Sequence, residues 1–433
     1  MSTTTTTTTT ESTIKVAPLL ASPSSKTNIG AIITGVDLND LSEKDFQEIR
    51  KAIYVHRVVV VRGQHKLHPA KQFEFVRRID PDSGSTHGFY GLVGDKKSRE
   101  KFGSLGTRKR YVIPGVEGVR LIGRDYQAEE YYGLKNIYVD STTQAEMLAT
   151  PLSDEEISEG NSRFVTFHMD GAIYDAIPSR VTALLCIKAP RGPPVTVRWD
   201  DDSGTTMKAA PGLTAFIDTV QLYNLLSDEE KALVENSRWE PAPHPFAWTG
   251  TRRLRSCGLG IAPGGEVLPL DKLPEWSPEK IYQFPMVWVN PVTGEKGLHI
   301  FCDVIRKLHF KSSPDGPERV VDDLEEIRTW LNNIMDRICK PEYISIPPYD
   351  EGDLVLFNNW GVIHSAIEYP VHYGSRLMHQ CHVSSSTAPT GTITEAIENP
   401  TVSDFEDFLI KSSLVKKKRQ DPTIDSTRAF VNE

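Results

Sequence analysis

Phe164-Val165-Thr166-Phe167-His168-Met169-Asp170 is the stretch of the sequence from which both the fold and the chemistry can be predicted. Its β-branched and aromatic residues are typical of a strand, in which successive side chains point to opposite faces. We therefore expect Thr166, His168 and Asp170 to share one face of a strand. An imidazole and a carboxylate then lie side by side on that face.

A second histidine, His364, and an arginine twelve residues after it, Arg376, extend this pair. Among 12 histidines, an aspartate two residues after a histidine should occur about once by chance, so His168 and Asp170 alone are a weak signal. With His364 the set becomes two histidines and one carboxylate, the facial triad that binds non-haem Fe(II) and leaves positions open for a co-substrate and oxygen. Arg376 adds a planar guanidinium, which pairs well with a carboxylate such as that of 2-oxoglutarate.

Regular alternation later in the chain predicts a second wall of this site. Ser375 to Ser384 reads as a strand with two different faces. One face carries Arg376, Met378, Gln380 and His382, and the other carries Leu377, His379, Cys381 and Val383. A short strand is also expected over Asp353 to Phe357, followed by a loop over Asn358 to Ile363 that leads to His364.

The composition is that of a globular protein that acts on small molecules. The 433 residues are 39% hydrophobic and 25% charged, and no apolar run approaches 18 residues, so we expect no membrane association. The formal net charge of -9 argues against a nucleic-acid partner, which would need a basic face. The five cysteines form no C-x-x-C pair, so reduced thiols and a cytoplasmic location are expected.

Both ends of the chain read as segments outside the folded domain. Residues 1–27 carry a run of eight threonines without a secretory or transit-peptide pattern, and they are predicted to be a disordered leader. Residues 28–384 are predicted to form one domain. Residues 385–433 are rich in Thr and Ser, carry the basic cluster Lys416-Lys417-Lys418-Arg419, and are predicted to be a solvated C-terminal extension.

Helices and strands are expected throughout the folded part. Ser42 with Asp45 resembles a capping box that opens a helix, and a second helix should start at Pro69. Val58 to Val61 is an apolar run typical of a strand buried on both faces. The other expected features are long loops from Pro81 to Leu134, strands over Val181 to Ile187 and Val195 to Trp199, and helices over Thr219 to Asn236, with a cap and kink at Ser227, and over Glu318 to Cys339.

Together these features resemble the TauD/TfdA family of taurine-dioxygenase-like enzymes, over about residues 28 to 384. The motifs that carry the resemblance are Gly30 to Leu38, Val58 to Gln64, His168 with Asp170, Phe284 to Phe301, Pro341-Glu342-Tyr343, and Asn359 to His364 followed by Arg376. Several stretches look closer still to fungal xanthine dioxygenases: Gln64-His65, Thr196-Val197-Arg198, Ala242-Pro243-His244-Pro245 and Gln380-Cys381.

The resemblance implies a fold, a chemistry and a set of binding residues. The implied fold is α+β with a mainly β core, a double-stranded β-helix (jelly roll, cupin-like) flanked by helices. The implied cofactors and co-substrates are Fe(2+), 2-oxoglutarate and O2. By the same resemblance, His168, Asp170 and His364 are the catalytic metal ligands, Arg376 binds the distal carboxylate of 2-oxoglutarate, and Thr196 hydrogen-bonds that co-substrate.

Candidate substrate contacts come from the same resemblance and from its departures. Gln380 falls where relatives contact substrate, and His87 is a further candidate on a loop. Xanthine dioxygenases have an asparagine in place of His382, a purine-contacting lysine in place of Asp140 and an arginine in place of Trp360. A carboxylate in place of a cation inverts the local field, so a substrate other than xanthine is expected.

We therefore expect an Fe(II)- and 2-oxoglutarate-dependent dioxygenase that oxidises a C–H bond of a small organic molecule in fungal specialised-metabolite biosynthesis, with release of succinate and CO2. Two alternatives stay open: a xanthine dioxygenase that converts xanthine to urate and, from another class, a non-catalytic jelly-roll binding protein. The sequence also leaves open the identity of the substrate, the choice between hydroxylation, desaturation and ring formation, and the oligomeric state.

Overall fold

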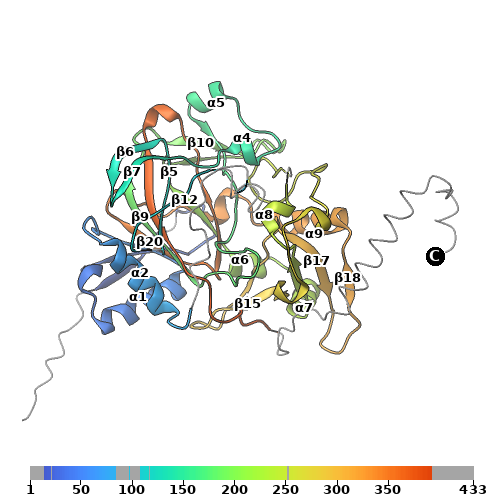
Figure 1. The fold of residues 1–433 in the computed structure, drawn as a ribbon. Helices are drawn as coiled ribbons and strands as arrows, with labels where there is room; N and C mark the ends of the chain where they lie inside the picture. The colour runs from blue at the N-terminus through green and yellow to red at the C-terminus, as the bar shows by residue number, and fades with distance from the viewer. Residues whose placement is uncertain are drawn as a thin grey trace, which may run out of the picture.

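The structure is a computed structural model that describes residues 14–20, 22–83, 97, 108–116, 118–250 and 253–392. A mixed sheet of eight strands, called the main sheet below, lies in the left half of the molecule as drawn in Figure 1. In spatial order its strands are β1 (Lys15–Pro18), β2 (Ala31–Thr34), β3 (Val58–Val61), β20 (Leu354–Asn358), β9 (Val181–Lys188), β22 (Arg376–Cys381), β5 (Val119–Arg124) and β4 (Tyr111–Val112).

Apolar runs explain the central strands of the main sheet. All four valines of β3 are fully buried, and β3 pairs with β2 on one side and with β20 on the other. A strand that is covered on both faces reads as a continuous apolar run, and each fully buried valine contributes roughly 1.5–3 kcal/mol to stability. The strand predicted over Val58 to Val61 is therefore confirmed.

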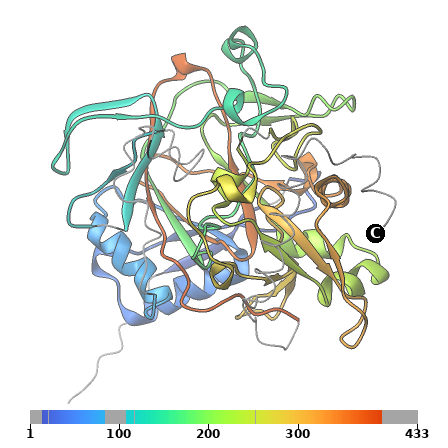
Figure 2. The same cartoon turned by 45° about the vertical axis from the view of Figure 1, so that its right-hand side comes forward.

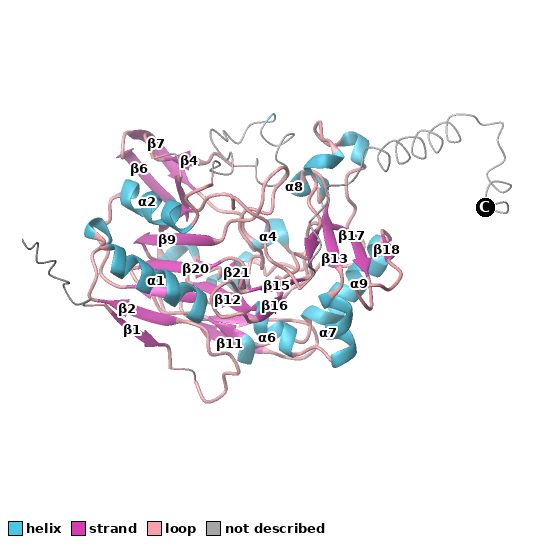
Figure 3. Cartoon of the chain, turned by 90° about the horizontal axis from the view of Figure 1, so that it is seen from below, coloured by secondary structure: helices cyan, strands magenta, loops and turns pink. Residues whose placement is uncertain are grey.

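Two helices, α1 (Glu43–His56) and α2 (Pro69–Ile79), cover one face of the main sheet (Figure 3). The Ser42 hydroxyl accepts a hydrogen bond from the Asp45 backbone N–H, which caps α1 as predicted. Phe46, Ile49 and Ile53 of α1 belong to the hydrophobic cluster on this side of the sheet. The helices shield that face, so the binding site has to lie on the other one.

Shorter sheets and helices pack on the opposite side, where a second and larger hydrophobic cluster lies. The three-stranded sheets are β11 (Thr206–Ala209), β10 (Val195–Arg198) and β8 (Asn161–Ser162), and β19 (Ile344–Ser345), β12 (Thr214–Asp218) and β21 (Val362–Ala366). A four-stranded sheet contains β14 (Phe284–Pro285), β13 (Arg238–Pro241), β17 (Ile305–Phe310) and β18 (Arg319–Val321), and two-stranded ones pair β15 (Val287–Val289) with β16 (Lys296–Leu298) and β6 (Tyr126–Tyr131) with β7 (Leu134–Val139).

The remaining helices are short and lie mostly around these smaller sheets. Figure 2 shows the N-terminal helices, in blue, on one side of the molecule and the green-to-orange layer of β13, β17, α7 and α9 on the other. The α-helices are α4 (Gln144–Met147), α5 (Asp154–Ser158), α6 (Thr219–Asn224), α7 (Asp228–Glu235), α8 (Pro245–Trp248) and α9 (Leu324–Met335). The 3-10 helices are η1 (Leu38–Asp40), η3 (Leu270–Lys272), η4 (Pro278–Lys280), η5 (Pro341–Tyr343) and η6 (Val371–Tyr373).

Two predictions about the ends of the domain need correction. Lys15–Pro18, inside the segment predicted to be a disordered leader, forms strand β1 at the edge of the main sheet. Its side chains are mostly exposed, so the strand is stabilised mainly by backbone pairing with β2. For the same reason the sequence contains no hydrophobic pattern from which this strand could have been predicted. Beyond residue 384, Ser385 and Ser386 still hydrogen-bond Asp80, so the packed part of the chain continues into the predicted extension.

Three predictions about internal elements were also wrong in part. The region read as long loops contains β5 and the β6–β7 hairpin, because alternate residues of β5 are buried although Arg120 and Arg124 lie between them. The helix predicted over Thr219 to Asn236 is two helices, α6 and α7, but the internal cap predicted at Ser227 is confirmed, because Ser227 and Glu230 form a full capping box at the start of α7. The helix predicted from Glu318 starts only at Leu324, where Asp323 caps it, since the residues before it form β18.

Mixed sheets flanked by helices confirm the expected α+β class. Among the helices of the described ranges, none has the length and apolar character needed to cross a membrane. All five cysteines are buried and free, as expected from their scattered positions.

Candidate metal and co-substrate site

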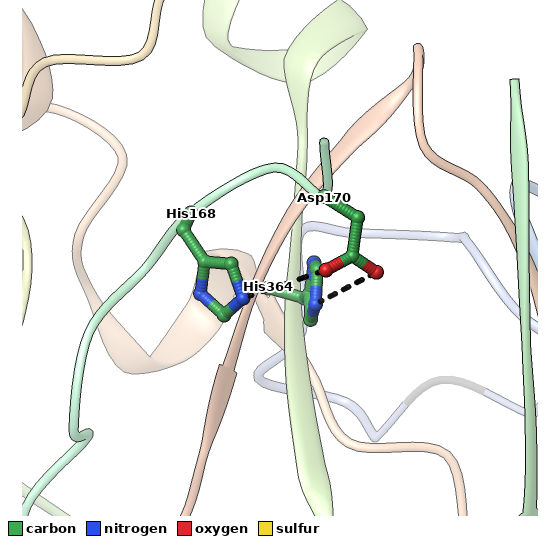
Figure 4. A group of neighbouring side chains, drawn as sticks. All are labelled: His168, Asp170 and His364. Atoms are coloured by element: carbon green, nitrogen blue, oxygen red, sulfur yellow. Dashed lines mark ion pairs between the residues drawn. The ribbon is translucent and has the colours of Figure 1, made fainter. Parts of the chain in front are cut away.

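The three side chains predicted to bind a metal, His168, Asp170 and His364, meet in the structure (Figure 4). Their candidate ligand atoms all lie within 4.8 Å of one another. Asp170 Oδ1 is 3.9 Å from His168 Nε2, and Asp170 Oδ2 is 3.8 Å from His364 Nε2. Atoms that share one ion through bonds of about 2.1 Å are about 3–4 Å apart, so the spacing suits a divalent metal ion.

Backbone pairing brings the two histidines together. His168 N donates to His364 O and His364 N donates to His168 O, both at 2.9 Å, which forms an isolated β-bridge. His364 lies inside strand β21, and not at the end of a loop as predicted. The segment from Phe164 to Asp170 is extended but is no regular strand, because it is held by separate bridges and by the bond from Phe167 N to Gly258 O.

The protonation of the two imidazoles suits metal binding. His168 Nδ1 donates to Thr166 O at 3.1 Å, which leaves the lone pair on Nε2 for a metal. Burial, reinforced by the neighbouring His168, lowers the pKa of His364 to about 3, so this ring is neutral near pH 7. His364 Nδ1 is also buried without a hydrogen-bond partner among the described residues. Two imidazoles and a carboxylate in this arrangement fit a transition metal such as Fe(II).

Asp170 is fixed by several donors. Its carboxylate accepts from Gln380 Nε2 at 3.2 and 3.1 Å and from Thr182 Oγ1 at 2.8 Å. Burial would raise the pKa of Asp170, but its interactions with the neighbouring His382, His364 and His168 rings and with the Arg120 guanidinium outweigh burial and hold that pKa below its usual value. The carboxylate therefore stays ionised and oriented.

The backbone of Asp170 is fixed as well, by Asn359. Asp170 N donates to Asn359 Oδ1 at 2.8 Å, and Asn359 Nδ2 donates to Asp170 O at 2.9 Å and to Ser179 O at 2.8 Å. Asn359 is fully buried and lies between β20 and β21. One amide thus ties the loop that carries Asp170 to the connection between β20 and β21, which leads to His364.

The triad borders a cavity of about 260 Å³. Its wall mixes apolar side chains, such as Ile122, Leu184 and Phe301, with three arginines: Arg110, Arg120 and Arg376. A mainly apolar cavity with a few convergent polar groups is the usual form of a small-molecule site.

Arg376, predicted to bind 2-oxoglutarate, lines this cavity at the start of β22. Its Nε donates to Gly212 O at 2.8 Å, and its Nη2 donates to Tyr349 Oη at 3.5 Å. These contacts with described residues use two of the five guanidinium N–H donors and leave a fork for a carboxylate. Gly123 makes the position possible, because a Cβ on this β5 residue would lie 2.1 Å from Arg376 O.

The threonine beside Arg376 is Thr214, and not the predicted Thr196. Thr214 is buried on β12, lines the cavity, and its Oγ1 lies 3.2 Å from Tyr349 Oη. Thr196 does not line the cavity, and its hydroxyl accepts from Lys208 Nζ at 2.5 Å. Val195 and Val197 of β10 point into the core, so the alternation of the strand turns Thr196 away from it.

Of the predicted substrate contacts that the structure describes, only Gln380 lines the cavity, and its amide is already bonded to Asp170. His382 lies behind Arg120, whose Nη2 donates to His382 Nε2 at 2.8 Å. Asp140 is outside the cavity lining and forms an ion pair of 2.6 Å with Arg108. His87 lies outside the described residues.

Trp360 has a structural environment. Its Nε1 donates to Pro178 O at 3.0 Å, its ring packs edge-on against Trp288, and the Arg180 guanidinium lies 5.4 Å from its centre. It does not line the cavity. The expectation that xanthine is excluded therefore receives no support from the positions of Trp360 and Asp140.

The residues that sequence reasoning missed are Arg110, Arg120, Ser141, Thr142, Thr214 and Tyr349. Arg120 could have been found, because Val119 and Leu121 flank it with the alternation of a strand. For the others the sequence holds no comparable signal, since their positions depend on how distant strands pair.

The chain is similar to known proteins over most of its length. The family model described as "Taurine catabolism dioxygenase TauD, TfdA family" matches residues 16–111 and 119–382. The alpha-ketoglutarate-dependent dioxygenase bsc9 of Alternaria brassicicola is 34% identical over 388 residues, which cover 87% of this chain and 96% of that protein. The alpha-ketoglutarate-dependent xanthine dioxygenase xanA of Emericella nidulans is 37% identical over 372 residues, which cover 86% and 97%.

A solved structure shows a similar fold. The crystal structure of a putative alpha-ketoglutarate-dependent taurine dioxygenase from Burkholderia xenovorans aligns with a TM-score of 0.50 at 18% identity. The alignment covers 90% of this chain and 97% of that one.

Proposed function

The chain belongs to the taurine catabolism dioxygenase TauD, TfdA family, and on that premise we propose which residues perform its chemistry. It is an Fe(II)- and 2-oxoglutarate-dependent dioxygenase. The observation that carries the proposal is the convergence of His168, Asp170 and His364 in the cavity that Arg376 also lines. A structural ion pair would need neither the second histidine nor a cavity.

In this proposal, His168, Asp170 and His364 bind the Fe(II) ion. When bound, the iron supplies, with 2-oxoglutarate and O2, the oxidising power to attack a C–H bond, and succinate and CO2 are released. Gln380 and Thr182 keep the Asp170 carboxylate ionised and in place, and Thr166 O fixes the tautomer of His168. The protein thereby holds the metal ligands in position before the metal binds.

Arg376 binds the distal carboxylate of 2-oxoglutarate through its free guanidinium fork. Thr214 and Tyr349 take the supporting role first assigned to Thr196, because their hydroxyls lie next to each other and next to Arg376. The apolar wall that includes Leu184 and Ile122 limits the entry of water, which protects a reactive site from side reactions.

The architecture behind this site is, in our proposal, a double-stranded β-helix within a single domain that includes β1 and reaches past residue 384. The support is that His364 on β21 and Arg376 with Gln380 on β22 face one cavity from two different sheets. A jelly roll encloses a site between two sheets in this way. We also propose a cytoplasmic location and no nucleic-acid or membrane partner, in line with the acidic charge and the five free thiols.

The substrate in our proposal is a small organic molecule of fungal specialised metabolism, oxidised at a C–H bond. The relatives from Alternaria brassicicola and Phomopsis amygdali are named as dioxygenases without a purine substrate. Oxidation of xanthine to urate is the second candidate, and 37% identity to the xanthine dioxygenase of Emericella nidulans favours it. Formation of urate from xanthine by the purified protein would decide for the second candidate.

The proposed ligands are tested by turnover and by metal binding together. Purified protein with Fe(II), 2-oxoglutarate and O2 should form succinate, and His168→Ala should abolish both succinate formation and tight binding of Mn(II) in calorimetry. His372 provides the matched control, because His372→Ala removes an imidazole that is exposed and lies outside the cavity lining. Absence of both turnover and metal binding in the unaltered protein would favour a non-catalytic binding protein.

A further inference from the structure

Arg110 is a cation in the cavity wall that has no counter-ion among the described residues. Arg376 and Arg120 also line the cavity, but both have partners: Arg376 bonds Gly212 and Tyr349, and Arg120 Nε donates to Gln380 Oε1 at 2.8 Å. Within the described part of the chain, no carboxylate or other acceptor lies within hydrogen-bond or ion-pair distance of the Arg110 guanidinium. Asp140 and Glu146 are both bound by Arg108.

Strand register places Arg110 away from the 2-oxoglutarate arginine. Tyr111 of β4 pairs with Leu121 of β5, so Arg110 lies opposite Ile122, which in turn pairs with Met378 of β22. Two strand spacings, about 10 Å, therefore separate Arg110 from the strand that carries Arg376. Arg110 and Ile122 both line the cavity, so the edge of the main sheet beyond β22 contributes a second cationic position.

The surroundings of Arg110 make its positive charge energetically unfavourable unless an anion is bound. Burial lowers the pKa of Arg110 to about 10, and the positive charges of Arg120 and Arg108 add to that effect. A half-buried charge with like-charged neighbours is unfavourable unless an opposite charge joins it. The Ser141 and Thr142 side chains line the same cavity, and no hydrogen bond of their hydroxyls with described residues occupies them.

We propose that Arg110, together with the Ser141 and Thr142 hydroxyls, binds a carboxylate of the primary substrate. The substrate class is then a carboxylic acid whose oxidised C–H bond lies between this subsite and the triad. A planar guanidinium binds a carboxylate through two parallel hydrogen bonds, and hydroxyls complete its acceptor capacity. The inference rests on the proposed function, because it assigns Arg376 to 2-oxoglutarate and leaves Arg110 for the second anion.

The test compares acids with their neutral isosteres while the Arg376 site is filled. Protein loaded with Mn(II) and saturating 2-oxoglutarate is titrated in a calorimeter with acetate, benzoate, phenylacetate and decanoate, and with the amide of each. We expect at least one acid to bind about 10- to 100-fold more tightly than its amide, the usual effect of a charged hydrogen bond. Arg110→Gln should remove this preference, and Arg110→Lys should retain part of it.

The matched control is Lys109→Gln, which removes the same unit charge from the next residue. Lys109 is exposed, and its ammonium lies over the Tyr111 ring outside the cavity lining. This variant should keep the preference for acids in full. The inference is overturned if no acid binds, if acids and amides bind the unaltered protein equally, or if both variants lose the preference alike.

Separate measurements distinguish this failure from failure of the proposed function. Binding of 2-oxoglutarate and formation of succinate without a primary substrate are measured on the same preparations. If both are present while the preference for acids is absent, only the carboxylate subsite is wrong. If 2-oxoglutarate does not bind, the assignment of Arg376 and the proposed function fail with it.

Discussion

The side-chain amide of Gln380 donates to both carboxylate oxygens of Asp170, at 3.2 Å to Oδ1 and 3.1 Å to Oδ2. Gln380 Oε1 accepts from Arg120 Nε, and Arg120 Nη2 donates to His382 Nε2. Gln380 was predicted to contact substrate, but these bonds make it a positioning residue for a proposed metal ligand. Arg120 and His382 extend this hydrogen-bonded chain behind Gln380.

Gln380→Leu should weaken metal binding by about 10- to 100-fold, which is the usual effect of losing a partner of a metal ligand. Leucine keeps much of the volume but donates nothing to Asp170. The measurement is the dissociation constant of Mn(II) by calorimetry, with thermal unfolding to establish that the variant is folded. Met378→Leu, a buried change on the same face of β22, should leave the constant within about twofold. Equal effects of both changes would assign Gln380 to packing alone.

Arg376→Lys should weaken the binding of 2-oxoglutarate by about 10- to 100-fold, because an ammonium cannot form the two parallel hydrogen bonds of a guanidinium fork. The readout is calorimetric titration with 2-oxoglutarate in the presence of Mn(II). Arg124→Lys is the matched control, since Arg124 pairs with Arg376 across β5 and β22 but lies outside the cavity lining. A normal affinity in Arg376→Lys would refute the assignment.

The two threonines give opposite expectations. Thr214→Val should weaken the binding of 2-oxoglutarate by about 3- to 10-fold, since it removes a hydroxyl at the Arg376 end of the cavity. Thr196→Val should have no measurable effect, because its hydroxyl bonds Lys208 outside the cavity lining. The same titration checks both variants. A larger loss in Thr196→Val than in Thr214→Val would restore the role that the family resemblance implied.

Glu240 should make stability depend on pH below pH 5. Burial would raise the pKa of this carboxyl, but the His309 imidazole, whose Nε2 lies 3.7 Å from Glu240 Oε2, and the charges of Arg306 and Lys307 lower it to about 2. A folded-state pKa below the unfolded value of about 4.3 adds stability above that value, and this stability is lost as the pH falls from about 4.3 to about 2. Glu240→Gln should therefore cost on the order of 3 kcal/mol in the free energy of unfolding at pH 7.

Urea denaturation of both proteins from pH 7 to pH 3 checks this expectation. The difference in the free energy of unfolding between the unaltered protein and Glu240→Gln should become smaller as the pH falls below about 4.3. Glu325 is exposed, so Glu325→Gln is the control for the loss of any carboxylate. It should change the free energy of unfolding by less than about 0.5 kcal/mol. A constant difference across the whole range would contradict the lowered pKa of Glu240.

Sequence reasoning succeeded where one local pattern decides the structure. The alternation from Ser375 to Ser384 separated the two faces of β22 correctly: Arg376 and Gln380 line the cavity, while Leu377 and Cys381 pack with the helices on the other side. This worked because β22 is paired on both sides, with β9 and β5, and so keeps a regular pleat. The convergence of His168, Asp170 and His364 was predicted from residue types that a metal requires.

Sequence reasoning failed where the position of a residue depends on pairing between strands that are distant in the sequence. Val195-Thr196-Val197 alternates equally well with Thr196 facing either way, and burial of the two valines decided against the site. Thr214 and Tyr349 reach Arg376 only through the register of β12 with its neighbours and the path of the chain before β20. Arg110 lay in a stretch read as long loops, because short strands rich in arginine lack an apolar pattern.

The edge position of β4 has a practical meaning for redesign of this enzyme. A strand paired on one side only, as β4 is within the described sheet, can be exchanged at the cost of few backbone hydrogen bonds. The triad and Arg376 are carried by other segments. A library of variants confined to residues 108–112 would therefore change the proposed substrate subsite at Arg110 and leave the proposed metal and 2-oxoglutarate sites unchanged. Chimaeras with related enzymes can be joined at this edge for the same reason.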